Sequence, residues 1–129
     1  MENNNNLKSM YFTLFILTLI ETVLFLFLGN LIAIATFIIA LILRSKMQSG
    51  TQMPFGIKLV IISTVLHFLV GFFSVFILIL SDLADYSDGL LIFAGFSSLI
   101  FMIFSLAVFV MLIISCVQIY SEYKAYDNY

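Results

Sequence analysis

The sequence predicts an all-α integral membrane protein, folded as a compact antiparallel four-helix transmembrane bundle. The chain has 129 residues, of which 64% are hydrophobic and 9% charged, and its mean hydropathy is +1.22. Soluble domains carry roughly 25% charged residues, so this chain has too few charges to cover a water-facing surface. Its apolar stretches are long enough for four crossings. All its basic residues then fall on one side of the bilayer: Lys8, Arg44, Lys46, Lys58 and Lys124.

This charge asymmetry also predicts the orientation. The opposite side receives only Asp82, Asp85 and Asp88. Basic loops are retained in the cytoplasm, whereas short acidic loops are translocated. We therefore expect a multi-pass protein of the plasma membrane with both termini in the cytoplasm.

The first half of the chain is predicted to form a helical hairpin. Residues 9–43 are almost continuously apolar, and one helix of that length would measure about 52 Å against a hydrocarbon core of about 30 Å. Gly29 and Asn30 tolerate the left-handed conformation of a tight turn, so we place spans at 8–28 and 31–47. A three-span alternative, in which 9–43 crosses once, would move Lys8 to the outer side. The preceding Asn-rich residues 1–6 are expected to be disordered.

The second half predicts another hairpin within the same single domain, residues 1–129. A polar loop with Pro54 leads into a span at 58–80, and an acidic loop separates it from a span at 89–119. The last span is longer than a bilayer needs, so it tilts, kinks near Gly95 or projects into the cytoplasm. The Tyr-rich tail 120–129 is read as an interfacial anchor; a docking or phosphorylated tail is the alternative.

Each predicted span carries one stripe of small or polar residues suited to helix packing. Membrane helices associate through such residues because they permit close approach and hydrogen bonding. The stripes comprise Thr18 and Thr22 in the first span, Ala33, Thr36 and Ala40 in the second, Ser63, Gly71 and Ser74 in the third, and Gly95, Ser98 and Ser105 in the fourth.

Two further residues, Glu21 and His67, exceed what packing requires. Both are predicted near mid-membrane, within about one turn of the same depth, on spans that enter from the same side. An ionisable group there costs about 2.5–3.5 kcal/mol on insertion scales, so it should face the bundle interior. One hypothesis is a proton-sensitive pair. The other is a structural tie, in which Glu21 bonds to Thr18, Thr22 or His67.

The glutamate in the middle of the first of four short spans, within Leu17-Thr18-Leu19-Ile20-Glu21-Thr22, resembles the layout of small multidrug resistance transporters. That resemblance implies a homodimer in which Glu21 exchanges protons for cationic substrates. The likeness covers span count, approximate length and Glu21. The aromatic and glycine motifs of the family's second and third spans are missing, Trp is absent, and His67 is an addition.

The sequence contains no motif for catalysis, cofactor binding or metal binding. It has no glycine-rich phosphate loop, and its single histidine and single cysteine (Cys116) cannot supply a typical zinc set. The lack of a basic cluster argues against nucleic acid as a partner. We therefore expect a non-enzymatic accessory, stabilising or immunity-type protein that packs against a larger membrane partner. The alternative is a small proton-coupled transporter or pore, working as a homo-oligomer with Glu21 as its coupling residue.

Overall fold

The computed structural model describes residues 4–25, 29–47 and 53–127, and these are helical except for short connections. The described residues contain no strand. Apolar residues make up most of each helix, and a segment containing Pro54 and an acidic segment around Asp85 separate the later helices. The elements are α1 (Asn4–Val23), α2 (Gly29–Lys46), α3 (Phe55–Leu83), the short 3-10 helix η1 (Ala84–Tyr86) and α4 (Asp88–Asp127).

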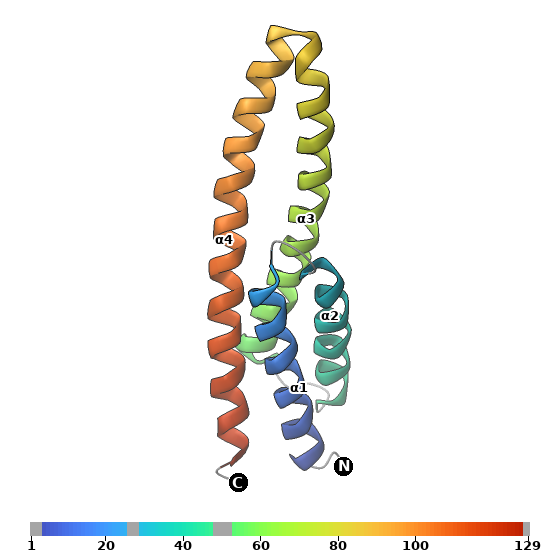
Figure 1. The fold of residues 1–129 in the computed structure, drawn as a ribbon. Helices are drawn as coiled ribbons and strands as arrows, with labels where there is room; N and C mark the ends of the chain where they lie inside the picture. The colour runs from blue at the N-terminus through green and yellow to red at the C-terminus, as the bar shows by residue number, and fades with distance from the viewer. Residues whose placement is uncertain (1–3, 26–28, 48–52, 128–129) are drawn as a thin grey trace.

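The four helices form a closed ring in one half of the molecule. Helix α1 packs against α2 and α4, and α3 packs against the same two helices. Figure 1 shows that α1 and α2 form one hairpin, that α3 and α4 form a second, and that both chain ends lie at the same end of the molecule. The antiparallel four-helix arrangement is therefore confined to that end.

The two hairpins differ greatly in length, which corrects the prediction of a compact bundle. Phe25, just beyond the end of α1, packs beside Val70 of α3 and Val108 of α4. Thirteen further residues of α3 lead from Val70 to Leu83, which is about 20 Å of helix. Over this distance α3 and α4 run together without α1 or α2 (Figure 1). We call the four-helix end the base and this α3–α4 extension the arm.

The predicted connections differ in detail from the observed ones. Gly29 and Asn30 open α2 rather than forming the predicted turn; a turn begins at Leu24 and Phe25, and residues 26–28 lie outside the described part. Helix α4 continues through Gly95 and into the predicted tail. The expected disorder of residues 1–6 is contradicted from Asn4 onward, where α1 begins; residues 1–3 lie outside the described part.

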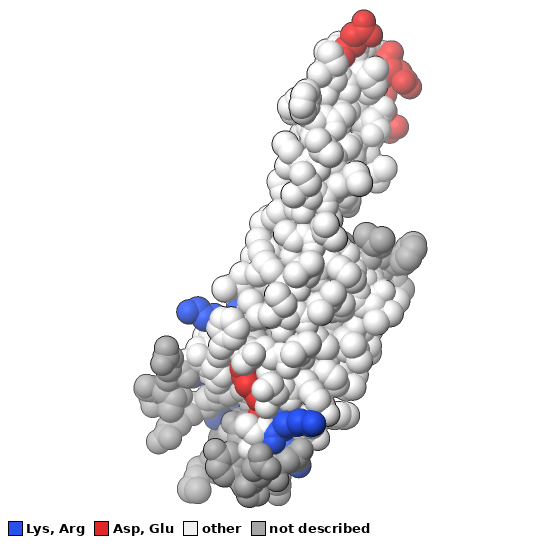
Figure 2. All heavy atoms as spheres, turned by 90° about the vertical axis from the view of Figure 1, so that its left-hand side faces the viewer, with Lys and Arg blue, Asp and Glu red and all other residues white. Residues whose placement is uncertain are grey.

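The charges separate along the long axis of the molecule. Lys8 belongs to the start of α1, Arg44 and Lys46 to the end of α2, and the other two basic residues to the start of α3 and the end of α4, all at the base. Asp82, Asp85 and Asp88 are exposed at the tip of the arm, as Figure 2 shows. Within the described residues, α3 with η1 (Phe55–Tyr86) and the segment Asp88–Ala125 of α4 are long and apolar enough to cross a membrane.

Two apolar clusters fill the base. The outer cluster, near the chain ends, contains Leu7, Tyr11, Leu14, Ala40, Leu43, Ile57, Val60 and Ile119. The inner cluster, near the start of the arm, contains Phe25, Val70, Val108 and Leu112. Together they leave a layer between them, and the buried polar residues occupy it.

Candidate functional site

The candidate site is a layer of buried polar side chains across the middle of the base. Its members come from all four helices, and each has no exposed surface: Thr18 and Glu21 of α1, Thr36 of α2, Ser63, Thr64 and His67 of α3, and Ser115 of α4. Each lies three or four residues along the chain from a buried apolar residue, and so on the same inward face. The inward face of α1, for example, runs from Leu14 through Thr18 and Glu21 to Phe25. The layer is thus sealed on both sides by the two apolar clusters.

Glu21 and His67 lie in contact at the centre of this layer. His67 Nδ1 is 2.5 Å from Glu21 Oε2, so the two side chains are directly hydrogen-bonded. The sequence placed the two residues at similar depth, and the structure brings them together. Of the three bonding partners expected for Glu21 in the structural interpretation, His67 is the one observed.

His67 also holds the end of α1 through two contacts with Phe25. Its Nε2 lies 3.4 Å from the carbonyl oxygen of Phe25, in the turn that follows α1. The ring of Phe25 stacks on the imidazole, with 4.5 Å between the ring centroids and 24° between the planes. A single side chain of α3 therefore fixes both the side chain of Glu21 and the backbone that follows α1.

These contacts fix one hydrogen of the His67 ring and leave two arrangements for the proton shared with Glu21. A carbonyl oxygen only accepts hydrogen bonds, so Nε2 of His67 must carry a hydrogen to bond Phe25. The proton between Nδ1 and Oε2 then belongs either to His67, giving an ion pair, or to Glu21, giving two neutral groups. The pair is neutral as a whole in both arrangements, and this neutrality limits the free energy of burying it.

The second carboxyl oxygen of Glu21 has no hydrogen-bond partner among the described residues. The neighbouring threonines do not supply one, because their hydroxyls donate to carbonyls one turn earlier in their own helices. Thr18 donates to Leu14 at 2.7 Å, Thr22 to Thr18 at 2.7 Å, Thr36 to Ile32 at 2.9 Å and Thr64 to Val60 at 2.9 Å. Oε1 of Glu21 is thus a buried acceptor with unused capacity.

A serine pair extends the layer toward α4. Ser63 Oγ and Ser115 Oγ are 3.0 Å apart, and Ser115 also donates to the carbonyl of Met111 at 2.7 Å. Because Ser115 uses its hydrogen on Met111, Ser63 is the donor between the two serines. The layer therefore ties α3 to α1 through Glu21 and to α4 through Ser115.

Sequence reasoning missed a second polar centre, formed by Glu122 at the outer edge of the base. Its carboxylate accepts hydrogen bonds from Tyr11 Oη at 3.0 Å, from the backbone N–H of Gly56 at 2.6 Å and from Gln118 Nε2 at 3.3 Å. Gly56 lies in the first turn of α3, where backbone N–H groups lack helical partners and favour an anion. The sequence signal for this contact was Pro54, because it marks the start of a helix. That helix start lies at the same end of the predicted bundle as Glu122.

The tyrosine tail packs back onto α1. Tyr120 and Tyr123 lie against Phe15 and Phe12, with centroid separations of 5.0 and 5.5 Å. Lys124 Nζ lies 4.9 Å from the centroid of the Tyr120 ring. Tyr129, the last tyrosine of the predicted anchor, lies outside the described residues.

The burial of the predicted packing residues depends on whether they lie in the base or along the arm. Within the base, Thr18, Ala33, Thr36, Ala40 and Ser63 are fully buried, Ser105 is buried, and Thr22 is half-buried. Along the arm Gly71, Ser74 and Ser98 are half-buried. Gly95 is exposed, and no atom lies within 4 Å of a Cβ built there. No described residue of this chain packs on Gly95, because α1 and α2 do not reach that level.

The described residues contain no group of three His, Cys, Asp or Glu side chains placed to share a metal ion. The comparisons with known proteins give no match to a family model, a curated protein or a solved structure. The site must therefore be interpreted from its own geometry. That geometry is a buried hydrogen bond between α1 and α3, in which Oε1 of Glu21 has no partner among the described residues.

Proposed function

We propose that this chain is a non-enzymatic accessory protein of the plasma membrane, which stabilises or shields a larger membrane protein by packing against its helices. Helices α3 and α4 cross the bilayer in this proposal. In the most apolar 18-residue segments of α3 and α4, only 28% and 22% of the residues are buried, whereas the core helices of a soluble protein are mostly buried. The basic base faces the cytoplasm and the acidic tip of the arm faces the other side, in accordance with the positive-inside rule.

The proposal gives α1 and α2 a different role from that of full spans. Their hairpin enters from the basic side and ends near mid-depth, about 20 Å short of the tip of α3. Lys8, Arg44 and Lys46 remain on the cytoplasmic side in this arrangement. A short hairpin leaves the arm free to contact another membrane protein.

The single observation that carries the proposal is the complete enclosure of the Glu21–His67 pair between two apolar clusters. A coupling residue has to be reached by its substrate, whereas both of these side chains have no exposed surface. The enclosed pair holds α1 on α3 and so keeps the base rigid. The arm instead exposes large apolar side chains such as Phe72 and Leu78, which a partner helix can cover.

Site-specific photocrosslinking in the native membrane tests this function. A photoreactive residue at Leu78 of the arm, 67% exposed, should yield one discrete adduct with a second protein, and the same residue at Val117 of the base, 65% exposed, should not. The adduct should persist in Glu21→Gln. Adducts of this chain with itself alone, or equal yields at the two positions, would contradict the accessory role.

The unused Oε1 of Glu21 favours a second candidate, proton-coupled transport by a homo-oligomer. Ionisable residues within membrane-spanning segments mark ion pathways and proton relays. This function predicts pH-dependent binding of a cationic substrate that disappears in Glu21→Gln. Retention of the protein's activity and of its pH dependence in both Glu21→Gln and His67→Ala would exclude it.

A further inference from the structure

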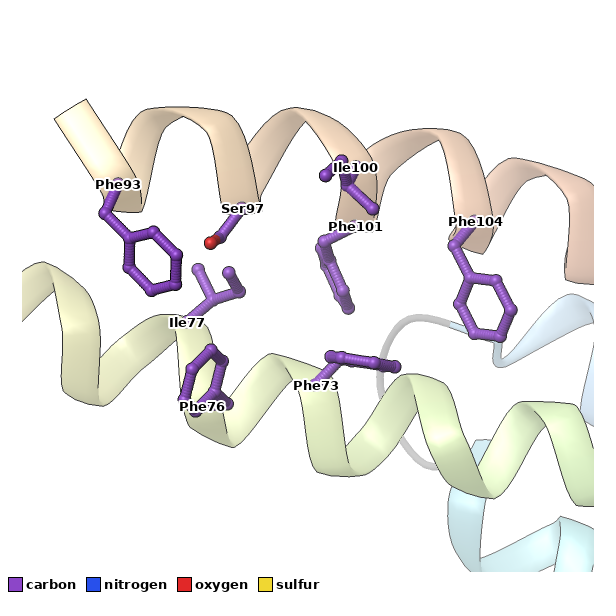
Figure 3. Close-up of a pocket in the computed structure, with 8 residues that line it drawn as sticks. All are labelled: Phe73, Phe76, Ile77, Phe93, Ser97, Ile100, Phe101 and Phe104. Atoms are coloured by element: carbon purple, nitrogen blue, oxygen red, sulfur yellow. The ribbon is translucent and has the colours of Figure 1, made fainter.

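An apolar crevice runs between α3 and α4 along the arm, away from the polar layer. It has a volume of about 450 Å³. As Figure 3 shows, the side chains of Phe73 and Ile77 enter it from α3, and those of Phe93, Ser97 and Phe101 from α4. Ser97 is the one polar residue in its lining. Volumes of this size and apolar linings of this kind are typical of ligand pockets.

The shape of the crevice selects a thin ligand. Its lining on α4 extends from Phe93 to Phe104, about 16 Å of helix, and its volume of about 450 Å³ is well below the roughly 1,300 Å³ that a helix of that length occupies with its side chains. Phe73 and Phe104 close the inner end in an edge-to-face contact, with 5.9 Å between centroids. A helix with side chains is about 10–12 Å across, so it does not fit. A single hydrocarbon chain does.

The charges near the crevice select the head group of that ligand. Its outer end at Phe93 lies five residues, about 7 Å, from Asp88 at the tip of the arm. Asp82 and Asp85 are exposed at the same tip, and no basic residue of the described chain lies there. An anionic head group would be repelled at this end, whereas an ammonium group would be attracted.

We propose that the crevice between α3 and α4 binds one acyl chain of a phospholipid with an amine-bearing head group, with that head group beside the acidic tip. The lipid comes from the half of the bilayer on the acidic side. It fills the gap between the two helices and leaves their outer faces free. This inference rests on the proposed insertion of α3 and α4 in the membrane.

Tryptophan fluorescence gives a direct test because the chain contains no Trp. Phe73→Trp places a unique reporter in the crevice. Phe72→Trp is the matched control, one residue away at the same depth but 75% exposed and outside the lining. Each full-length variant is titrated in detergent micelles with phosphatidylethanolamine brominated on its acyl chains, a contact quencher. Brominated phosphatidylglycerol and a brominated free fatty acid serve as the other ligands.

We expect phosphatidylethanolamine to quench Phe73→Trp saturably and to at least halve its emission, with little effect on Phe72→Trp. Adding Ser97→Leu, which fills the crevice, should abolish the quenching while the helical circular dichroism signal stays unchanged. Equal quenching of the two reporters, or quenching that survives Ser97→Leu, would overturn the site. Equal binding of phosphatidylglycerol or of the fatty acid would overturn the head-group assignment.

The same variants separate this inference from the proposed membrane insertion. In bilayers made of brominated lipid, Phe72→Trp reports contact with bulk lipid and should be strongly quenched. An unquenched Phe72→Trp in bilayers would refute the insertion of α3. Equal responses of the two reporters in micelles would refute the crevice alone.

Discussion

The base and the arm are built from the same two long helices but are stabilised differently. In the base, α1 and α2 pack against α3 and α4. The inward faces of α1, α3 and α4 carry hydroxyls, an imidazole and a carboxyl group that form hydrogen bonds between helices. In the arm the two helices have each other alone, and they meet through phenylalanines such as Phe73 and Phe104. Polar side chains on these helices are therefore buried where neighbours surround them on several sides. The contrast predicts that mutations will act strongly in the base and weakly in the arm.

The largest effect is expected from His67→Ala in the base. This change removes the partner of Glu21, the bond to the Phe25 carbonyl and the stacked ring in one step. Breaking a buried pair by removing one member destabilises by about 3–5 kcal/mol. The free energy of unfolding in mixed micelles measures it. Phe72→Ala in the arm is the control, and a loss as large as that of His67→Ala would remove the distinction between the two regions.

Glu122→Ala should have the next largest effect, because Glu122 binds Tyr11 of α1 and the first turn of α3 together. Hydrogen bonds to a charged group contribute about 1.5–3 kcal/mol when buried, and the half-buried position of Glu122 brings the expected loss to about 1–2 kcal/mol. The same unfolding measurement applies. Glu122→Gln keeps an acceptor and should recover part of the loss; a Gln variant as unstable as the Ala variant would argue against these hydrogen bonds.

Glu21→Gln should be milder still, at about 1 kcal/mol, because the amide still hydrogen-bonds to His67. The comparison with Glu21→Ala distinguishes a hydrogen-bonded tie from simple filling of space. If the tie holds α1 on α3, the Gln variant keeps α1 protected from amide hydrogen exchange and the Ala variant does not. Equal loss of protection in both variants would require the ionised carboxylate itself.

The smallest effects are expected from two glycine substitutions, and these should have opposite signs. A Cβ at Gly56 in the base would lie 2.5 Å from Glu122 Oε2, so Gly56→Ala displaces that carboxylate. A Cβ at Gly95 in the arm meets open space, and Gly95→Ala should stabilise α4 by about 0.5–1 kcal/mol through helix propensity. Thermal unfolding of the two variants tests this pair. A destabilising Gly95→Ala would show that another molecule packs closely against the arm at that position.

Much of the helical architecture follows directly from the sequence. Pro54 and the acidic segment around Asp82 bound long apolar runs and so indicate where α3 and α4 form, because a helix satisfies its backbone hydrogen bonds within one segment. The alignment of Glu21 with His67 followed from counting residues inward from the basic ends. Glu122 was missed because its partners are a backbone N–H and a tyrosine far away in the sequence, and neither leaves a periodic signal.

The chain's sequence by itself determined the helices, their antiparallel order, the gathering of basic residues at one end and the two ionisable residues that lie in the interior of the base. These properties depend on local composition and on rise per residue, which a sequence contains. Only the tertiary structure decided that the α1–α2 hairpin stops halfway along α3 and α4, that His67 binds the end of α1 and that the arm holds an open crevice. These properties depend on how one hairpin is positioned along the other, and hydrophobic packing between uniformly apolar helices leaves that position unmarked in the sequence.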